Sequence, residues 1–456
     1  MFRKIILHNF KSFSDLEFNL EGRNGIPLKT AMVFGENGAG KTNLIDSVRF
    51  LKESVSTYDS INQKAISMLL EALEVESGDS EDFREIKSSL NGLFDTIRKL
   101  PDDKQDLGSL IRNYMTVGSE DGMRVTYVFD VDGNRAEYTI GSDREGRLVY
   151  ENLRSVKESR IGNYYSIESD GEKISARISD SLITDPVFMK ETREAVRQYW
   201  GRHSLFSMLN HQFEVKNEIF MRDAVSAAFR RIRNYVDSVM IGTEAMTTVP
   251  ELPFGIVSGI IGPGDSKALD AYETAIDAFF TSICSDVRRV YYNKEGRSGR
   301  MTYSLMFDRM IAGKTRSIPY EQESSGTRKL VRLFPSLIGC LGGRTVFIDE
   351  LDSNIHDRMI MELIQRIIGS VSGQLVFTTH NTQLLEEADP HTAFIIDVDP
   401  DGFKSIAPIS RIARTQSNHN NRIRYLNGTF SGVPYVGYID LEGIVDTLSE
   451  ELREGR

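Results

Sequence analysis

The segment Gly35, Glu36, Asn37, Gly38, Ala39, Gly40, Lys41 and Thr42 matches the pattern G-x-x-x-x-G-K-[ST]. It lies between a predicted strand at residues 30–34 and a predicted helix at residues 43–53. Glycines let successive backbone N–H groups point at phosphate oxygens, and the following helix adds its positive end. We therefore predict a phosphate-binding loop in which all eight residues bind a nucleoside triphosphate. Lys41 would contact the β and γ phosphates, and the Thr42 hydroxyl would bind Mg²⁺.

Two carboxylates, Asp349 and Glu350, follow a predicted buried strand at residues 345–348. Many strands end in acidic turns, so this pattern is weak by itself. Beside a phosphate-binding loop, however, the first acid of such a pair holds Mg²⁺ through its water shell, and the second positions or deprotonates the attacking water. We predict Asp349 as a metal-binding residue and Glu350 as a catalytic base.

Two further sites depend on their position relative to these acids. Ser324, Ser325 and Gly326 form a small-residue turn that opens a predicted helix at residues 327–340, and this turn alone would suggest an ordinary N-cap. His380 follows a predicted strand at residues 374–379, where a lone histidine is more often a turn residue. Next to a phosphate site, its imidazole N–H is able to donate to a γ-phosphate.

These motifs, in this order, resemble the ABC-type ATPases of the SMC, RecF and overcoming-lysogenization-defect group. Residues 6–13 look like the opening strand of that group, and residues 324–326 stand where it has its signature motif. Residues 351–353, which include Asp352, look like its D-loop, and His380 looks like its H-switch. The resemblance covers the head segments, about half of the chain.

The resemblance implies a head that hydrolyses ATP with Mg²⁺ at a site shared between two subunits. Ser324, Ser325, Gly326 and Asp352 would then bind nucleotide, and His380 would join Glu350 in catalysis. The charge at the γ-phosphate would be neutralised by Lys41, by Mg²⁺ and by the partner's helix N-terminus. Gln212 and Gln198 are candidates for the Q-loop glutamine of this group, although an ordinary polar role is favoured for both.

The predicted elements indicate an α/β fold. Residues 5–18 are expected to form paired strands, and residues 123–153 an antiparallel meander with a hairpin turn at Asp132 and Gly133. From residue 327 to 398, helices alternate with short apolar strands, which is typical of a parallel sheet with crossover helices. The sequence therefore predicts a P-loop NTPase with an ABC-type head, a mixed or parallel sheet, an antiparallel β subdomain and helical insertions.

The predicted head comprises residues 1–55, 118–180 and 296–456, with helical insertions at 56–117 and 181–295. Helices are expected within these insertions at residues 61–73, 83–100, 186–239 and 267–290, and a further helix is expected in the head at 382–388. The wide separation of the Walker A and signature motifs is filled by broken helices, which argues against a long coiled-coil arm.

Composition limits the remaining functions. The chain has 456 residues, a net charge of -11 and two cysteines, so neither a disulfide framework nor a zinc module is indicated. No signal peptide or membrane span is predicted, and a cytoplasmic location is expected. The acidic balance argues against a protein that coats nucleic acid with its whole surface, but a local basic groove stays open.

The C-terminal part narrows the choice within the group. Few residues follow His380, which argues against an appended nuclease domain, so Asp397 and Asp399 are interpreted as a strand-end turn. Residues 410–414 and 425–434 resemble the tail of compact stand-alone ATPases, which are often subunits of anti-phage systems such as PARIS, Septu-like and retron-linked systems. This resemblance implies a homo-oligomer of at least two chains that senses infection and controls a separately encoded nuclease or toxin.

The alternative function is a RecF-like DNA-binding ATPase in repair or recombination. Its candidate contacts are two basic clusters, Arg230, Arg231 and Arg233 in one, and Arg288, Arg289, Lys294, Arg297 and Arg300 in the other. We favour the interpretation that these side chains form solvated surfaces and pair with the acids of the chain. A scaffold without hydrolysis is disfavoured by the presence of Glu350.

Overall fold

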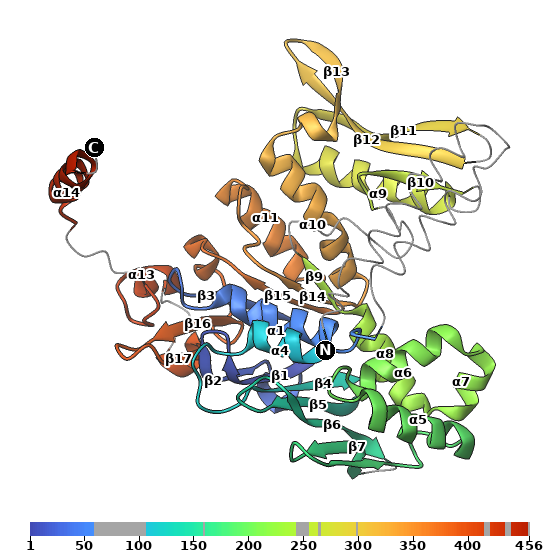
Figure 1. The fold of residues 1–456 in the computed structure, drawn as a ribbon. Coiled ribbons are helices and arrows are strands. Elements are labelled where there is room, and N and C mark those ends of the chain that lie inside the picture. Colours follow the sequence, from blue (N-terminus) through green and yellow to red (C-terminus); the bar gives the residue numbers. More distant parts are fainter. Residues whose placement is uncertain are drawn as a thin grey trace.

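The computed structural model describes residues 1–58, 106–157, 160–242, 255–262, 266–297, 300–414, 420–433 and 439–454. The helices predicted at residues 61–73 and 83–100 lie outside these ranges. Figure 1 shows a central sheet with an antiparallel sheet below it, a lobe of strands above it and the C-terminal helix set apart. Within the described part of the chain, no helix is long and apolar enough to cross a membrane.

The central sheet has six strands in the order β17-β16-β3-β15-β14-β9. Five of them run parallel, and only the edge strand β17 is antiparallel to its neighbour. Every residue of β3, β14 and β15 is buried, as expected for parallel strands covered on both faces. The bounds are β3 (Thr30–Phe34), β9 (Met240–Gly242), β14 (Thr345–Ile348), β15 (Gln374–Thr378), β16 (Ala393–Val398) and β17 (Lys404–Pro408).

The second sheet is antiparallel, with seven strands in the order β2-β1-β4-β5-β6-β7-β8. It contains the predicted paired strands and meander, and the turn at Asp132 and Gly133 has two positive φ angles, as the predicted hairpin requires. The bounds are β1 (Phe2–Phe10), β2 (Phe13–Asn19), β4 (Arg124–Val131), β5 (Asn134–Ser142), β6 (Leu148–Lys157), β7 (Arg160–Ser169) and β8 (Ile174–Ile178). Strand β8 alternates apolar and polar residues, but of its five residues only Ile178 is buried.

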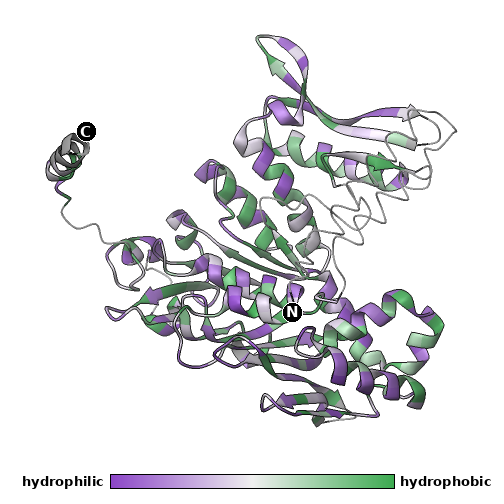
Figure 2. Cartoon of the chain, in the orientation of Figure 1, coloured by the Kyte–Doolittle hydropathy of each residue, from purple (hydrophilic) through white to green (hydrophobic). Residues whose placement is uncertain are grey.

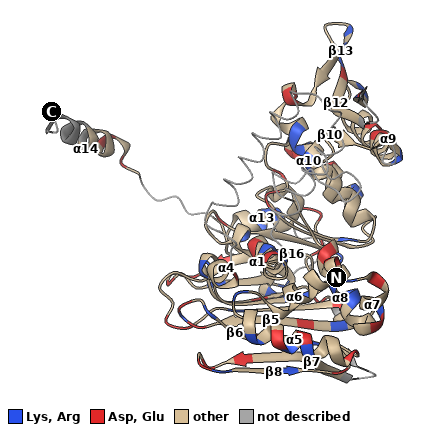
Figure 3. Cartoon of the chain, turned by 45° about the vertical axis from the view of Figure 1, so that its right-hand side comes forward, with Lys and Arg blue, Asp and Glu red and all other residues tan. Residues whose placement is uncertain are grey.

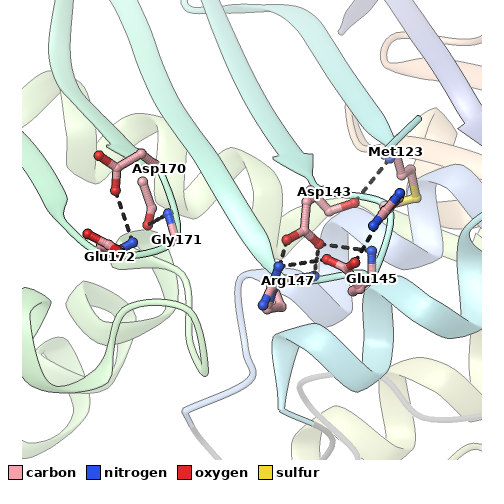
Figure 4. A network of polar contacts seen from close by, with 10 residues as sticks. Met123, Asp143, Glu145, Arg147, Asp170, Gly171 and Glu172 are labelled. Atoms are coloured by element: carbon pink, nitrogen blue, oxygen red, sulfur yellow. Dashed lines mark hydrogen bonds and ion pairs between the residues drawn. The ribbon is translucent and has the colours of Figure 1, made fainter. Parts of the chain in front are cut away.

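Two turns of this sheet are closed by aspartate side chains (Figure 4). Asp143 accepts hydrogen bonds from the backbone N–H groups of Glu145 and Arg147 and pairs with the Arg147 guanidinium. Asp170 accepts from the backbone N–H groups of Glu172 and Lys173. These Asx-type turns fix the register of β5 with β6 and of β7 with β8.

Helices cover both faces of the central sheet. On one face, apolar residues of β3, β15 and β16 pack with α1 (Lys41–Ser54), α4 (Leu107–Tyr114) and the antiparallel sheet. On the other face, alternate residues of the same strands pack with α10 (Ser325–Leu341) and α11 (Asp357–Ile368). Figure 2 shows the resulting band of hydrophobic residues through the middle of the molecule. This layering confirms the predicted fold class, an α/β ABC-type head with a mixed sheet and an antiparallel β subdomain.

The segment 181–295 contains helices but also three strands. Its helices are α5 (Pro186–Tyr199), α6 (Leu205–Val215), α7 (Glu218–Ala224), α8 (Ala227–Ser238) and α9 (Ser266–Ile283). Strand β9 belongs to the central sheet, whereas β10 (Ser258–Ile261) and β11 (Val287–Arg297) pair with β12 (Arg300–Ile311), which also pairs with β13 (Lys314–Pro319). We call β10 to β13 with α9 the β lobe. The division of the chain into a head and two insertions stays a prediction, because the bounds of helices and strands do not define domain boundaries.

Two of the helix predictions were wrong. Residues 287–290 are the start of β11, where the register shifts between Val287 and Arg289, so that the buried Val287 and Val290 acquire a helix-like spacing of three. The helix predicted at 382–388 is only a short 3-10 turn, η3 (Thr382–Leu385). The remaining short elements are η1 (Arg23–Gly25), η2 (Tyr320–Gln322), α12 (Ile409–Ile412) and α13 (Asn421–Leu426), followed by the C-terminal α14 (Leu441–Glu454).

A buried carboxylate attaches the helices α5 and α6 to the antiparallel sheet. Glu151 on β6 is fully buried, and its two oxygens accept hydrogen bonds from the backbone N–H groups of Leu205 and Phe206, the indole of Trp200 and the hydroxyls of Tyr138 and Tyr165. Two of these donors are the first N–H groups of α6, which have no partner inside their own helix. The carboxylate therefore satisfies a helix end that would otherwise be buried without partners.

We predict that Glu151→Leu lowers the free energy of unfolding by about 3 kcal/mol or more, because five donors lose one acceptor group while the side-chain volume is kept. Thermal unfolding followed by circular dichroism measures the effect. Glu168→Leu on β7 is the matched control, since Glu168 is exposed. Equal unfolding midpoints for the two variants would show that the carboxylate does not anchor α6.

Candidate nucleotide-binding site

The phosphate-binding loop joins the end of β3 to the start of α1, as the sequence predicts. Gly40 is the N-cap of α1 and has a φ of 109°, a conformation that favours glycine. A Cβ at this position would come within 2.7 Å of the Phe13 ring, which stands at the start of β2. The loop therefore rests against the antiparallel sheet, and residue 40 must be glycine for both reasons.

Lys41 is the buried cation of this loop. Its side chain donates to the backbone oxygens of Gly35 and Glu36 at 2.9 Å each, and the residue is only 6% exposed. Burial lowers the pKa of the Lys41 ammonium, and the nearby carboxylates of Asp349, Glu350 and Asp352 oppose that shift. The structure thus brings the predicted Walker A lysine into the electrostatic field of the predicted Walker B acids.

The two acids stand at the end of β14 and are oriented by a neighbouring strand. The Thr378 hydroxyl on β15 donates to Asp349 Oδ1 at 2.6 Å and accepts from the Glu350 backbone N–H at 2.8 Å. Glu350 is exposed and has a φ of 45°, which is uncommon for a residue other than glycine. Backbone strain of this kind is typical of functional sites, since the surrounding contacts must hold it in place.

The predicted D-loop and H-switch are in direct contact. The backbone N–H of His380 donates to Asp352 Oδ2 at 3.2 Å, while Asp352 Oδ1 is buried and has no hydrogen-bond partner. His380 itself is exposed at the end of β15. An unsatisfied buried oxygen beside a phosphate-binding loop is a feature of a site that is completed by further groups.

The predicted signature residues lie at the start of α10. Ser324 is the N-cap, and its hydroxyl accepts from the Thr327 backbone N–H; Ser324 and Ser325 are exposed. A Cβ at Gly326 would come within 2.8 Å of the Asn354 backbone oxygen, so the signature turn packs closely on the loop that follows Asp352. The predicted D-loop therefore contacts His380 of the same chain, and the residue that follows it contacts the predicted signature turn.

Two polar residues at the site were not predicted from the sequence. Thr378, which orients both acids, ends an otherwise buried strand, and a hydroxyl at that position was the available signal. Lys404 on β17 donates to the Gly38 backbone oxygen at 2.7 Å and lies 5.9 Å from the Phe13 ring centre. Burial lowers the pKa of Lys404, and Glu36 opposes that shift. Nothing in its sequence surroundings marks Lys404 as part of this loop.

Two other candidates have ordinary roles. Asp399 accepts from the backbone N–H groups of Asp401 and Phe403 in the turn between β16 and β17, which confirms the strand-end interpretation of Asp397 and Asp399. The described residues contain no cluster of three or more acids, histidines or cysteines able to hold a metal. Gln212 lies on α6, and among the described residues no hydrogen bond links its side chain to the phosphate-binding loop.

The arrangement fits a nucleotide with its magnesium ion. The first N–H groups of α1 have no partner inside the helix, so they and the Lys41 ammonium are able to hold phosphate oxygens. Thr42 is exposed at the first turn of α1, and Asp349 is held by Thr378 through only one of its oxygens. These two side chains are the ones that would hold Mg²⁺.

Several known proteins are similar to this chain. A retron Vc95 probable ATPase from Vibrio cholerae serotype O1 biovar El Tor is 20% identical over 436 residues, which cover 90% of this chain and 76% of the relative. An SMC head bound to the C-winged helix domain of ScpA has a TM-score of 0.45 and 14% identity, and the match covers 89% of this chain and 96% of that one. RecF of the RecFOR pathway has a TM-score of 0.37 and 11% identity, with 89% and 98% covered.

A family model described as "AAA domain, putative AbiEii toxin, Type IV TA system" matches residues 31–386. The match begins within β3, just before the phosphate-binding loop, and ends after His380, so it includes the loop, the two acids, the signature turn and His380 but not Lys404. Because it spans most of the chain, the protein belongs to this AAA-domain family.

Proposed function

We propose that this protein is a Mg²⁺-dependent ATPase whose ATP sites are completed between two copies of the chain, and that it serves as the regulatory subunit of an anti-phage defence system. The observation that supports the ATPase most strongly is the convergence of Lys41, Asp349 and Glu350 at the carboxyl edge of the central sheet. Membership of the AAA-domain family supports ATP as the nucleotide.

Each side chain has a role that follows from its position. Lys41 and the N–H groups at the start of α1 bind the β and γ phosphates. Thr42 and Asp349 hold Mg²⁺, which when bound neutralises phosphate charge. Glu350 is exposed and stands beside Asp349, so it is placed to take a proton from a water molecule that attacks the γ-phosphate. His380 is placed to donate to the same phosphate.

The exposure of the signature turn supports a shared site. Ser324 and Ser325 begin α10 with their side chains exposed, and the N–H groups of the first turn of α10 offer a second anion-binding helix start. In this proposal they contact ATP held by the phosphate-binding loop of a second copy. ATP binding and dimerisation are then coupled, because each copy supplies half of the site.

The role in defence rests on the relatives. The retron Vc95 probable ATPase is similar over 90% of this chain, and the family description refers to a toxin of a toxin-antitoxin system. A compact ATPase of this kind needs a separate protein to act on the phage or the host. We therefore propose that the protein holds or releases a separately encoded nuclease or toxin in response to infection.

DNA binding is less well supported by the contacts of the basic clusters. Arg231 pairs with Asp132 and Arg233 with Asp237, while Arg289 and Lys294 pair with acids of α9. Figure 3 shows Lys and Arg interspersed with Asp and Glu over these regions. The side chains of Arg297 and Arg300 lie outside the described residues. A groove for DNA requires cations that face the phosphates, and most of the described ones already have acidic partners.

We predict that Glu350→Gln retains ATP binding but loses turnover, because the amide is unable to accept the proton of the attacking water. The variant should accumulate as an ATP-bound dimer in size-exclusion chromatography with light scattering. Lys41→Ala is the control, since by itself it should not bind ATP and should not accumulate as an ATP-bound dimer. Turnover equal to that of the wild type would rule out Glu350 as the catalytic base.

Mixing two inactive variants tests the shared site. Lys41→Ala and Ser324→Ala damage different halves of the site, so a mixture should recover about a quarter of the wild-type ATPase rate, since half of randomly assorted dimers are mixed and each of these keeps one complete site. Steady-state phosphate release measures the rate. If the mixture stays as inactive as its components, each site is contained within one chain.

The defence role predicts protection that depends on ATP. Cells that carry this gene with its neighbouring genes should resist phage plating, and Lys41→Ala in the same gene set should remove the resistance. Binding of the purified protein to duplex DNA should be weak at all salt concentrations. A DNA affinity that falls steeply with salt, together with unchanged phage plating, would favour the RecF-like alternative.

A further inference from the structure

A buried ion pair joins the β lobe to the signature turn. Arg309 on β12 contacts Glu323, the residue before Ser324, through two hydrogen bonds: Nε to Oε1 at 2.7 Å and Nη2 to Oε2 at 2.8 Å. The exposed fractions of the two side chains are 13% and 3%. A bidentate guanidinium pair of this kind fixes orientation as well as charge, because both groups are planar. Neither residue belongs to the nucleotide-binding motifs.

The Arg309 guanidinium makes two further hydrogen bonds, one to the segment between α9 and β11 and one to α10. Arg309 Nη1 donates to Asp286 Oδ2 at 2.6 Å, at the point where α9 is followed by β11. Arg309 Nη2 also donates to Thr327 Oγ1 at 3.0 Å, in the first turn of α10. One side chain therefore connects the base of the β lobe with the helix that carries the signature residues.

Thr327 links Arg309 to Ser324 by hydrogen bonds. The two hydroxyl oxygens lie 2.9 Å apart, and the Thr327 backbone N–H donates to Ser324 Oγ at 3.2 Å. Arginine has only donors, so Thr327 Oγ1 accepts from Arg309 and its own proton is available for Ser324. If Thr327 donates its proton, Ser324 Oγ accepts from both the N–H and the O–H of Thr327, and the Ser324 proton is then free to point outward to another acceptor.

The charge of Glu323 makes Arg309 necessary for this arrangement. An unpaired carboxylate next to Ser324 would repel phosphate oxygens and would attract the hydroxyl protons of Thr327 and Ser324. With Arg309 in place, both carboxylate oxygens are used by the guanidinium. The signature turn is then left with outward-facing donors only.

The chain connectivity adds a mechanical link. Strand β13 follows β12 and leads through η2 to Glu323, so the signature turn is attached to the lobe once by the backbone and once by Arg309. Helix α10 then ends just before β14, which carries Asp349 and Glu350. A shift of the lobe therefore moves the signature turn as one unit with the β12–β13 hairpin.

We propose that Arg309 is a positioning residue for the signature serine: through Glu323 and Thr327 it directs the Ser324 hydroxyl toward the γ-phosphate of ATP bound by a second copy, and it thereby connects the β lobe to ATP hydrolysis. This inference rests on the proposed shared site. Since the argument concerns orientation rather than nucleotide contact, Arg309 is expected to change kcat and not the binding of ATP to the same chain's phosphate-binding loop.

The test uses Arg309→Met, with Arg316→Met as its matched control, because Arg316 faces Arg309 across β12 and β13 and is exposed. Arg309→Met should lower kcat by about tenfold or more, as expected when a donor to the transition state is misplaced, while the Kd of a fluorescent ATP analogue stays at the wild-type value. Arg316→Met should leave both quantities unchanged. A wild-type kcat for Arg309→Met would overturn the inference.

Mixing experiments identify the half of the site that is damaged. Arg309→Met mixed with Lys41→Ala should recover about a quarter of the wild-type rate, whereas Arg309→Met mixed with Ser324→Ala should recover none, because both changes lie in the signature half. Recovery in the second mixture would overturn the inference. The reference mixture of Lys41→Ala with Ser324→Ala tests the shared site itself, so a failure there contradicts the proposed function instead.

A second variant covers the case in which Arg309→Met misfolds, which loss of the ATP analogue's binding would reveal. Thr327→Val keeps the pair of Arg309 with Glu323 but removes the hydroxyl between Arg309 and Ser324. It should bind the ATP analogue normally, lose kcat and follow the same mixing pattern as Ser324→Ala. Normal turnover by Thr327→Val would overturn the proposed route through the hydroxyl.

Discussion

The structure of the site depends on one constraint, the burial of the Lys41 ammonium. A buried cation is tolerated only where oxygens surround it, and here two backbone oxygens of the loop contact it while three carboxylates act on it from the segment that follows β14. Parallel strands bring their carboxyl ends to a single edge. The order of strands in the sheet therefore determines which acids lie near the lysine, and β14 and β15 supply both the acids and the threonine that orients them.

Two other buried charges attach the outer parts of the molecule to this centre, in different ways. Glu151 is solvated by N–H and O–H donors and holds the helices α5 and α6, while Glu323 is paired with a guanidinium and holds the β lobe. The donors around Glu151 come from α6, from the end of α5 and from strands β5 and β7, so they hold a junction outside the nucleotide-binding motifs. An arginine pair connects two separate elements, so a change in one is transmitted to the other. The β lobe is thus the outer part whose position bears on the signature turn.

The sequence predicted those parts of the fold that short-range patterns determine. Strands β3 and β14 have the predicted bounds and β15 ends one residue earlier than predicted, since buried parallel strands are continuous apolar runs that end at turn residues. Strand β11 was missed because a bulge gives its buried valines the spacing of a helix. Thr378, Lys404 and Arg309 were missed for another reason: each acts on residues that are 14 or more positions away in the chain, so its role depends on the fold.

Glu350 and the signature serines are exposed in a single chain, and this exposure bears on how the site excludes water. Transfer of a phosphoryl group to water requires that the attacking water be held and that bulk water be excluded. In one chain the acid is held in a strained conformation and is open to solvent, and the donors of α10 face outward with no phosphate of their own chain assigned to them. A second copy would cover the acid of the first and would bring Ser324 to its phosphates. In the proposed dimer, hydrolysis would depend on how closely two copies approach, and the β lobe, attached to the signature turn through Arg309, is the part through which another protein would alter that approach.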